Sequence, residues 1–118
     1  MTSRLQALRA AAELAGCSKK QLRSLLPYVD EVTVPAGRPI AVKGRPCNQF
    51  VILAEGRLRS GTPGNGQHSL APGDSFGWTA MWERTENDAT LVAETEARLL
   101  VMGHAQFRAI KGVAARPA

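Results

Sequence analysis

Apolar residues recur at helical spacing in the first part of the chain. Between residues 3 and 15, Leu5, Leu8 and Ala12 follow one another at intervals of three and four residues. This spacing places them on one face of a helix, and the neighbouring alanines favour a helix intrinsically. Gly16 is a typical stop signal, so we expect a first helix over residues 3–15.

A second helix is predicted directly after the first. Ser18 and Gln21 have the spacing of a capping box, in which each side chain accepts a hydrogen bond from the backbone N–H of the other residue. Leucines follow on one face, and Pro27 ends the helix because its ring cannot continue the helical hydrogen bonding. The two helices form an N-terminal helical segment over residues 1–29.

From residue 30 the hydrophobic period changes from helical to alternating, which indicates strands. Short apolar runs are separated by turns rich in Gly and Pro; the runs include EVTV, PIAV, QFVILAE, RLRS, HSL, TLVA and ARLLVM. The run QFVILAE is apolar at nearly every position, as expected of a strand buried on both faces. Gly56 follows it and predicts a tight hairpin to the next strand, and residues 62–67, TPGNGQ, predict a hairpin loop.

Residues 104–112, HAQFRAIKG, return to helical spacing and predict a short C-terminal helix. The chain therefore contains two short helices, about eight short strands and one more helix. Many short strands at regular spacing favour a sandwich or a closed roll. We divide the chain into the helical segment 1–29, a β-roll over residues 30–103, and a short C-terminal helix and tail over residues 104–118.

The composition fits one globular domain. The 118 residues allow little more than a single domain, and a hydrophobic fraction of 44% is enough to form a core. No apolar run approaches the ~20 residues that span a bilayer, and the first residues lack the order of a signal peptide. We therefore expect no membrane insertion and a cytoplasmic location, bacterial or general, with Cys17 and Cys47 as thiols.

The net charge of +5 is unevenly distributed. Residues 1–60 carry ten Lys and Arg against four Asp and Glu, whereas residues 61–118 carry five against six. The basic half could contact nucleic acid or an acidic partner, or it could be ordinary solvated surface. We favour solvated surface, because the positive residues are dispersed and no aromatic residues alternate with them.

The chain shows no arrangement that is typical of an enzyme. Its two histidines, His68 and His104, lie on distant segments and form no metal-binding cluster. No Ser or Cys is paired with a base in the sequence, and GTPGNGQ lacks the Lys-Ser/Thr ending of a phosphate-binding loop. We therefore expect no enzymatic activity.

Two long segments resemble a known family, the cyclic nucleotide-binding domain. They are VPAGRPIAVKGRPCNQFVILAEGRLRS and LAPGDSFGWTAMWERTENDATLVAETEARLLVM, and the resemblance extends from about residue 16 to residue 111. Its anchors are Gly37, Gly44 and Gly56, followed by PGDSFG at residues 72–77. Turn glycines of an unrelated β-roll are the alternative.

The family occurs in protein-kinase regulatory subunits, cyclic nucleotide-gated channels and catabolite-activator-type transcription factors. The resemblance implies a mainly β fold with flanking α-helices. It implies an eight-stranded antiparallel jelly roll, or double-stranded β-helix, with two short N-terminal helices and a short C-terminal helix.

The resemblance also implies a phosphate-binding cassette. In the family, a Gly-Glu-x-Ala turn begins a short helix whose N-terminal amides face a cyclic phosphate; the Glu takes the ribose hydroxyl, and a later Arg pairs with the phosphate. The corresponding residues here, with Arg84 between them, are Gly77, Trp78, Thr79, Ala80, Arg84, Asn87, Asp88, Ala89 and Thr90. Trp78 stands at the position of the Glu and Asn87 at that of the Arg, so both charged ligand groups are missing.

The charges around the cassette disfavour a phosphate. Residues 83–96 carry five acidic residues and one basic residue, Arg84. Asp88 would repel a phosphate if it pointed inward. Arg84 is the expected replacement cation within the cassette, and Arg45 or Arg57 are candidates from elsewhere in the chain.

Trp78 and Trp82 lie four residues apart and share a face if the segment is helical. They could stack on a purine or another flat ligand, or they could fill the vacated pocket or cover the roll. We favour packing, because aromatic pairs at helical spacing usually pack against other side chains.

Two functions follow from the resemblance and from these departures. The first is a regulatory module that binds cyclic AMP or cyclic GMP weakly or not at all and acts through a protein partner or effector domain. The alternative is a sensor that binds a cyclic nucleotide or a related small molecule in a non-standard pocket. No helix-turn-helix motif follows the roll in this sequence, so we expect no direct DNA binding.

Overall fold

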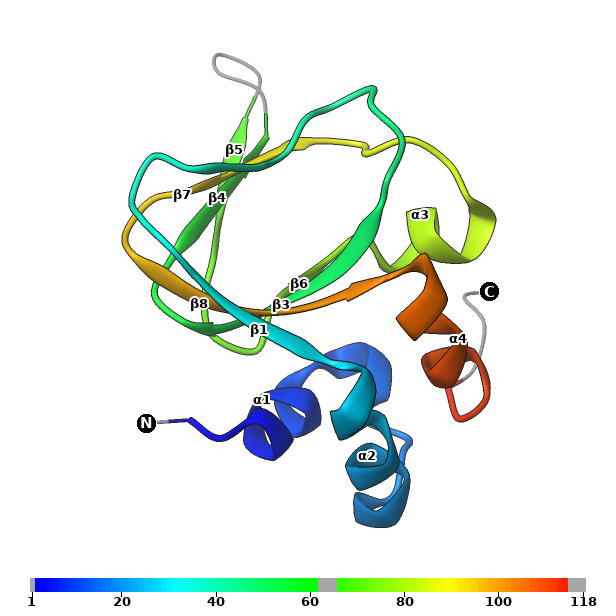
Figure 1. The fold of residues 1–118 in the computed structure, drawn as a ribbon. Helices are drawn as coiled ribbons and strands as arrows, with labels where there is room; N and C mark the ends of the chain where they lie inside the picture. Colours follow the sequence, from blue (N-terminus) through cyan, green and yellow to red (C-terminus); the bar gives the residue numbers. More distant parts are fainter. Residues whose placement is uncertain (1, 62–65, 115–118) are drawn as a thin grey trace.

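A computed structural model of the chain describes residues 2–61 and 66–114 (Figure 1). The helices and 3-10 turns are α1 (Arg4–Ala10), η1 (Ala12–Leu14), α2 (Lys19–Leu25), η2 (Leu26–Tyr28), α3 (Trp78–Glu83) and α4 (His104–Lys111). Within these described ranges, none of the helices combines the length and the apolar character needed to cross a bilayer.

The strands form two four-stranded sheets with antiparallel pairing. They are β1 (Asp30–Val34), β2 (Pro39–Ala41), β3 (Gln49–Glu55), β4 (Leu58–Gly61), β5 (Gln67–Leu70), β6 (Ser75–Phe76), β7 (Thr90–Ala93) and β8 (Ala97–Gly103). One sheet has the order β1-β8-β3-β6 and the other β2-β7-β4-β5. The mainly β, eight-stranded antiparallel roll predicted from the sequence is therefore confirmed, although the strands form two sheets and no closed barrel within the described residues.

Capping boxes begin both N-terminal helices. Ser18 and Gln21 exchange the predicted hydrogen bonds at the start of α2, and Ser3 and Gln6 do the same at the start of α1. The prediction of one continuous helix over residues 3–15 is wrong. Ala11 is extended, with φ −70° and ψ 125°, and is fully buried, so tertiary packing overrides the helical preference of alanine at this position.

Two hydrophobic clusters lie on opposite faces of β3. Phe50 and Ile52 point toward α1, α2 and α4, whereas Val51 and Leu53 point into the roll between the two sheets. All four side chains are at most 1% exposed, which confirms the prediction of a strand buried on both faces. Figure 1 shows the N-terminal helices and α4 gathered on the side of this sheet that faces away from the roll.

The chain passes from one sheet to the other at Gly56, so the predicted tight hairpin between β3 and β4 is wrong. β3 pairs with β6 and β8, while β4 pairs with β5 and β7. Gly56 has φ 96°, and a Cβ there would collide with the carbonyl oxygen of Glu96. The predicted hairpin loop TPGNGQ falls mostly on residues 62–65, outside the described residues, but the strands on either side of it pair.

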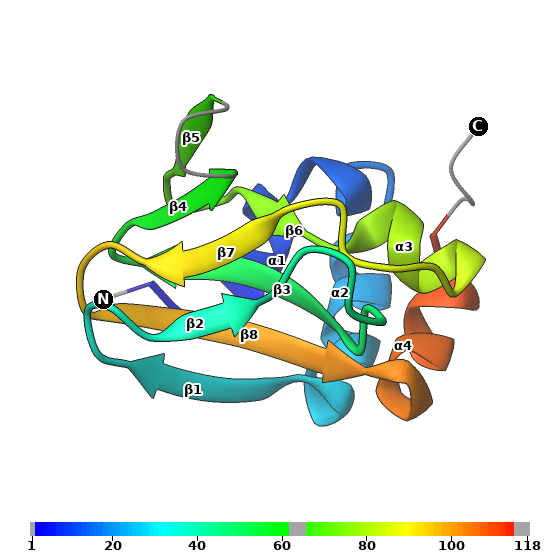
Figure 2. The ribbon, with the colours of Figure 1, turned by 90° about the horizontal axis from the view of Figure 1, so that it is seen from above.

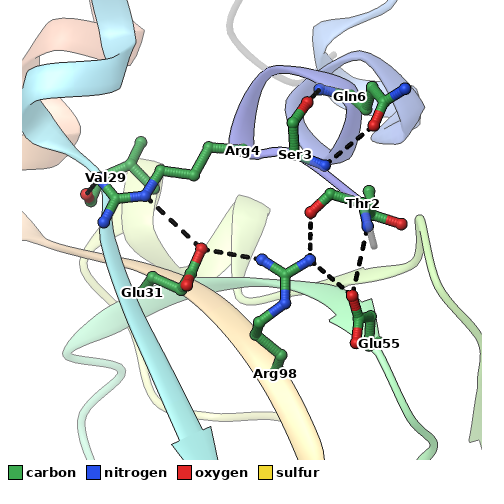
Figure 3. A network of polar contacts seen from close by, with 8 residues as sticks. All are labelled: Thr2, Ser3, Arg4, Gln6, Val29, Glu31, Glu55 and Arg98. Carbon is green, nitrogen blue, oxygen red and sulfur yellow. Dashed lines mark hydrogen bonds and ion pairs between the residues drawn. The ribbon is translucent and has the colours of Figure 1, made fainter.

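A buried arginine connects the beginning of the chain to the first sheet (Figure 3). The guanidinium of Arg98, on β8, pairs with Glu31 of β1 at 2.8 Å and with Glu55 of β3 at 2.9 Å. It also donates a hydrogen bond to the carbonyl oxygen of Thr2, and Arg4 pairs with Glu31 at 3.6 Å. Hydrogen bonding to Arg98 lowers the pKa of Glu55, and the same contact raises the pKa of Arg98.

Candidate functional site

A cavity of about 720 Å³ lies where β4, β5 and β6 meet the start of α3. The segment 85–89, which leads into β7, forms one wall of the cavity. Lys43 and Glu13 reach the cavity from two other parts of the chain. The cavity thus combines residues from the N-terminal helical segment, from both sheets and from α3.

Seven of the nine cassette residues predicted from the sequence line this cavity: Gly77, Trp78, Thr79, Ala80, Asn87, Asp88 and Ala89. Arg84 does not. It ends α3 in a left-handed conformation and lines a neighbouring hollow beside Pro46. Thr90 lies next to the wall, where its hydroxyl accepts a hydrogen bond from the backbone N–H of Lys43 at 3.1 Å.

Gly77 allows α3 to begin at the cavity wall. Its φ is 98°, a conformation that residues with a side chain rarely adopt. A Cβ on Gly77 would lie 2.8 Å from the carbonyl oxygen of Gln49 and 3.2 Å from the Sγ of Cys47. The first turn of α3 lines the cavity, so backbone N–H groups without intrahelical acceptors lie in its wall.

Cys47 supports Gly77 from behind. Its side chain is 2% exposed and donates a hydrogen bond to the carbonyl oxygen of Gln49 at 3.5 Å. Burial raises the pKa of this thiol, and the nearby carboxylate of Asp88 adds to the effect. Cys47 therefore stays a neutral packing residue, and both cysteines of the chain are free thiols, as predicted.

The side chain of Asn87 is engaged within the protein. Asn87 is buried, and its Nδ2 donates a hydrogen bond to the carbonyl oxygen of Val42 at 3.1 Å. Its backbone N–H donates to the carbonyl oxygen of Arg45, and its own carbonyl oxygen accepts from the N–H of Gly44. The amide at the position of the family's phosphate arginine thus holds two loops together.

The charged groups around the cavity are mostly acidic. Among the described residues, those that line it include Glu13, Glu86 and Asp88, against the single cation of Lys43. No arginine in the described ranges lines the cavity. An anionic ligand would therefore meet more repulsion than attraction from the side chains that the structure places here.

Trp78 and Trp82 take part in an aromatic cluster between α3 and α4. The ring of Trp78 makes edge contacts with Phe50 at 5.2 Å and with Phe107 at 5.5 Å between centroids. Trp82 contacts Trp78 at 5.9 Å and Phe107 at 6.0 Å, and Lys111 lies over its ring. Figure 2 shows α3 beside α4, the arrangement that these rings hold in place.

Glu13 also reaches the cavity, although no sequence motif predicts it there. The hydroxyl of Ser75, on β6, donates a hydrogen bond to Oε2 of Glu13 at 2.6 Å. One signal was available, because Glu13 is the only acidic residue among residues 1–29. Lys43 gave no comparable signal, since it follows β2 among several other basic residues.

The two-sheet roll with a cavity beside a short helix defines a jelly-roll domain. A family model described as "Cyclic nucleotide-binding domain" matches residues 31–111, so the chain belongs to the cyclic nucleotide-binding domain family. This is a family of regulatory rather than catalytic domains.

Individual relatives agree with this family. The chain is 29% identical over 102 residues to a cAMP-dependent protein kinase regulatory subunit of Aspergillus niger. The matched region covers 77% of this chain and 25% of that protein. The chain therefore spans about a quarter of the length of this curated relative.

Solved structures share the fold at lower identity. The regulatory domain of Toxoplasma gondii PKA with cAMP matches 91% of this chain and 42% of its own, with a TM-score of 0.82 and 21% identity. A cyclic nucleotide-binding-like protein from Brucella abortus matches 92% of this chain and 97% of its own, with a TM-score of 0.77 and 21% identity.

Proposed function

We propose that this chain is a non-catalytic regulatory module that binds cyclic AMP and cyclic GMP weakly or not at all and acts through contacts with another protein. One observation carries the proposal. Asn87, at the position of the family's phosphate arginine, is buried and uses its side-chain amide on the carbonyl oxygen of Val42.

The missing arginine charge lowers the affinity of the cavity for a cyclic phosphate. A hydrogen bond to a charged group contributes about 1.5–3 kcal/mol, and each 1.4 kcal/mol is a factor of about ten in affinity. Loss of the arginine alone therefore weakens phosphate binding by about ten- to a hundredfold. Asp88 and Glu86, which line the same cavity, weaken it further.

A protein partner or effector domain is the second part of the proposal. The Aspergillus niger relative is named as a regulatory subunit of a protein kinase, which supports a role in which the domain acts on another chain. We propose a cytoplasmic location and no direct contact with DNA. The acidic cavity wall supports neither a DNA nor an anionic-lipid ligand at this site.

Calorimetric titration with cyclic AMP and cyclic GMP tests the proposal. We expect no saturable heat at micromolar ligand for the natural chain, and a measurable gain for Asn87→Arg, which restores the cation at the wall. Asn48→Arg is the matched control, because Asn48 is exposed and does not line the cavity. Micromolar binding of either cyclic nucleotide by the natural chain would refute the proposal.

A second candidate function, a small-molecule sensor with a non-standard pocket, is favoured by the cavity itself. Its volume of about 720 Å³ is in the range of small-molecule sites. The ring of Trp78 packs on Phe50 and the ring of Trp82 packs on Phe107. Because these rings are engaged in the aromatic cluster, this packing supports a cavity with room for a ligand. Saturable amide NMR shifts at Gly77 and Ala80 with a small ligand would support this function.

A further inference from the structure

The helices that cover the outer face of the first sheet are strongly basic. Residues 3–29 and 104–114 together carry seven Lys and Arg and a single acidic residue, Glu13. Glu13 does not balance these charges at the surface, because Ser75 of β6 holds one of its oxygens and the other is buried. The fold therefore gathers cations that are dispersed in the sequence into one helical layer (Figure 1).

Four of these cations and one aromatic residue lie exposed on two neighbouring helical segments. We call them the α2–α4 surface, which consists of Lys19, Lys20, Arg23, Tyr28 and Arg108. The Sγ of Cys17, just before α2, donates a hydrogen bond to the carbonyl oxygen of Val113, just after α4, at 3.6 Å. At the other end of α2, the turn η2 packs against α4. The two helices are therefore neighbours at both ends of α2.

The four cations of the α2–α4 surface have no acidic partner in the parts of the chain that the structure describes. The ion pairs found there belong to Arg4 and Arg98. Lys19 and Lys20 begin α2, where the positive end of the helix dipole disfavours cations, and no acidic residue lies in this first turn. The stability of α2 therefore does not explain the two lysines, and carboxylates from another molecule would complement them.

Tyr28 adds an apolar anchor to the charged surface. It is 48% exposed and lies in η2, whereas the other exposed large apolar side chains of the described residues, Val32 and Val42, lie on the roll. Tyrosine is enriched at protein interfaces, because its ring buries apolar area while its hydroxyl finds a polar partner. A matching ligand therefore combines several carboxylates with an apolar side chain.

An acidic protein segment fits the α2–α4 surface better than a nucleic acid or a membrane does. Single-stranded nucleic acid stacks successive bases on a series of aromatic rings, and this surface offers one ring. A membrane-bound helix inserts its apolar face into the lipid, but Leu22 and Leu25, on the apolar face of α2, are buried in the core.

We propose that the α2–α4 surface docks an acidic segment of a partner protein. Carboxylates of the segment pair with Lys20, Arg23 and Arg108, and one of its apolar side chains packs on Tyr28. The inference rests on the proposed action through another protein, and it names the docking face and the chemistry of the partner. None of the residues of this surface lines the acidic cavity beside α3.

Titration of the full chain with a synthetic peptide tests the inference. The probe is a short peptide of glutamates with one central phenylalanine, and the same peptide with glutamines is its uncharged counterpart. We expect the glutamate peptide to bind saturably below about 1 mM at low salt, and the glutamine peptide not to bind. High salt should weaken the binding about tenfold or more, because salt screens exposed charges.

Charge reversal locates the binding on the chain. Lys20→Glu combined with Arg23→Glu should weaken peptide binding about tenfold or more. Arg38→Glu combined with Arg57→Glu is the matched control, because it changes the net charge equally at exposed cations outside the helices. Equal losses in the two double variants would show attraction by net charge alone and would overturn the inference.

Amide NMR of the natural chain gives a second measurement that does not depend on a variant folding. The bound glutamate peptide should shift the signals of Lys20, Arg23 and Arg108 and leave those of Gly77 and Ala80 unchanged. Shifts confined to other parts of the chain would overturn the inference. Tighter binding of an oligothymidylate or of phosphatidylserine vesicles than of the peptide would overturn it as well.

This inference and the proposed function fail in different ways. Absence of saturable peptide binding up to about 1 mM would overturn the docking surface and leave the proposal of weak or absent cyclic nucleotide binding standing. Micromolar binding of cyclic AMP would instead overturn that proposal and leave the result for the docking surface unchanged.

Discussion

The side-chain amide of Asn87 donates a hydrogen bond to the carbonyl oxygen of Val42 across 3.1 Å, and this bond joins the cavity wall to the turn that follows β2. Asn87→Ala removes the donor. We expect the free energy of unfolding to fall by about 1 kcal/mol, the usual net contribution of one such bond. Urea denaturation measures the change, with Asn48→Ala at an exposed position as the control. Equal stability of the two variants would contradict the structural role of the Asn87 amide.

Trp78 holds α3 against the rest of the domain through its contacts with Phe50 and Phe107. Trp78→Ala should lower the free energy of unfolding by about 2–4 kcal/mol, because a large half-buried ring is lost and a cavity remains. Trp78→Phe keeps an aromatic ring and should cost clearly less. Urea denaturation followed by far-UV circular dichroism measures both. A Trp78→Ala variant as stable as the natural chain would show that the cluster contributes nothing.

Gly77 combines a positive φ with close backbone neighbours, whereas Gly37 has a similar φ of 87° and no atom within 4 Å of an added Cβ. Both Gly→Ala variants should suffer the conformational cost of about 1–2 kcal/mol. Gly77→Ala should cost more than Gly37→Ala, because its methyl group also meets the Gln49 carbonyl oxygen at 2.8 Å. Thermal denaturation of the pair checks this order. The reverse order would show that the contact at Gly77 relaxes easily.

The Glu55–Arg98 pair should make stability depend on acid pH. The pKa of Glu55 in the folded protein is lowered from its ordinary value of 4.5, mainly by the hydrogen bond from Arg98. The unfolded chain therefore binds the proton first, and the stabilisation is fully present above pH 4.5 and is lost as the pH falls through the lower folded value.

Glu55→Gln should flatten the stability curve over this acid range, since the titrating group is gone. Urea denaturation between about pH 6 and pH 3 measures the effect. Glu94→Gln, at an exposed carboxylate outside the ion-pair network, should keep the natural pH dependence. An unchanged slope in Glu55→Gln would assign the acid sensitivity to other carboxylates.

The periodicity of hydrophobic residues predicted most of the fold, because the spacing of apolar residues indicates which side of a helix or strand is buried. The capping box at Ser18 and the doubly buried strand QFVILAE both follow from neighbouring residues alone. Two features depend on distant packing and could not be predicted in this way. Ala11 breaks the first helix where it is buried, and Gly56 marks a turn without recording which sheet the next strand joins.

The candidate site was predictable where it is contiguous in the chain. The family pattern indicated seven residues that the structure places on the cavity, all between Gly77 and Ala89. Glu13 and Lys43 lie far away in sequence, so only the fold brings them there. The four-residue spacing of Trp78 and Trp82 predicted a shared face, but the direction of that face depends on Phe107, which belongs to another helix.

Because β3 exposes Phe50 and Ile52 to the helices and Val51 and Leu53 to the interior of the roll, one strand serves as a wall common to both compartments. A shortened chain that begins at residue 30 would lose α1 and α2, which cover this outer face of β3 together with α4. Such a fragment would expose apolar side chains of the sheet to water and would tend to aggregate. The two N-terminal helices are therefore part of the folded core, and a truncated protein should retain them.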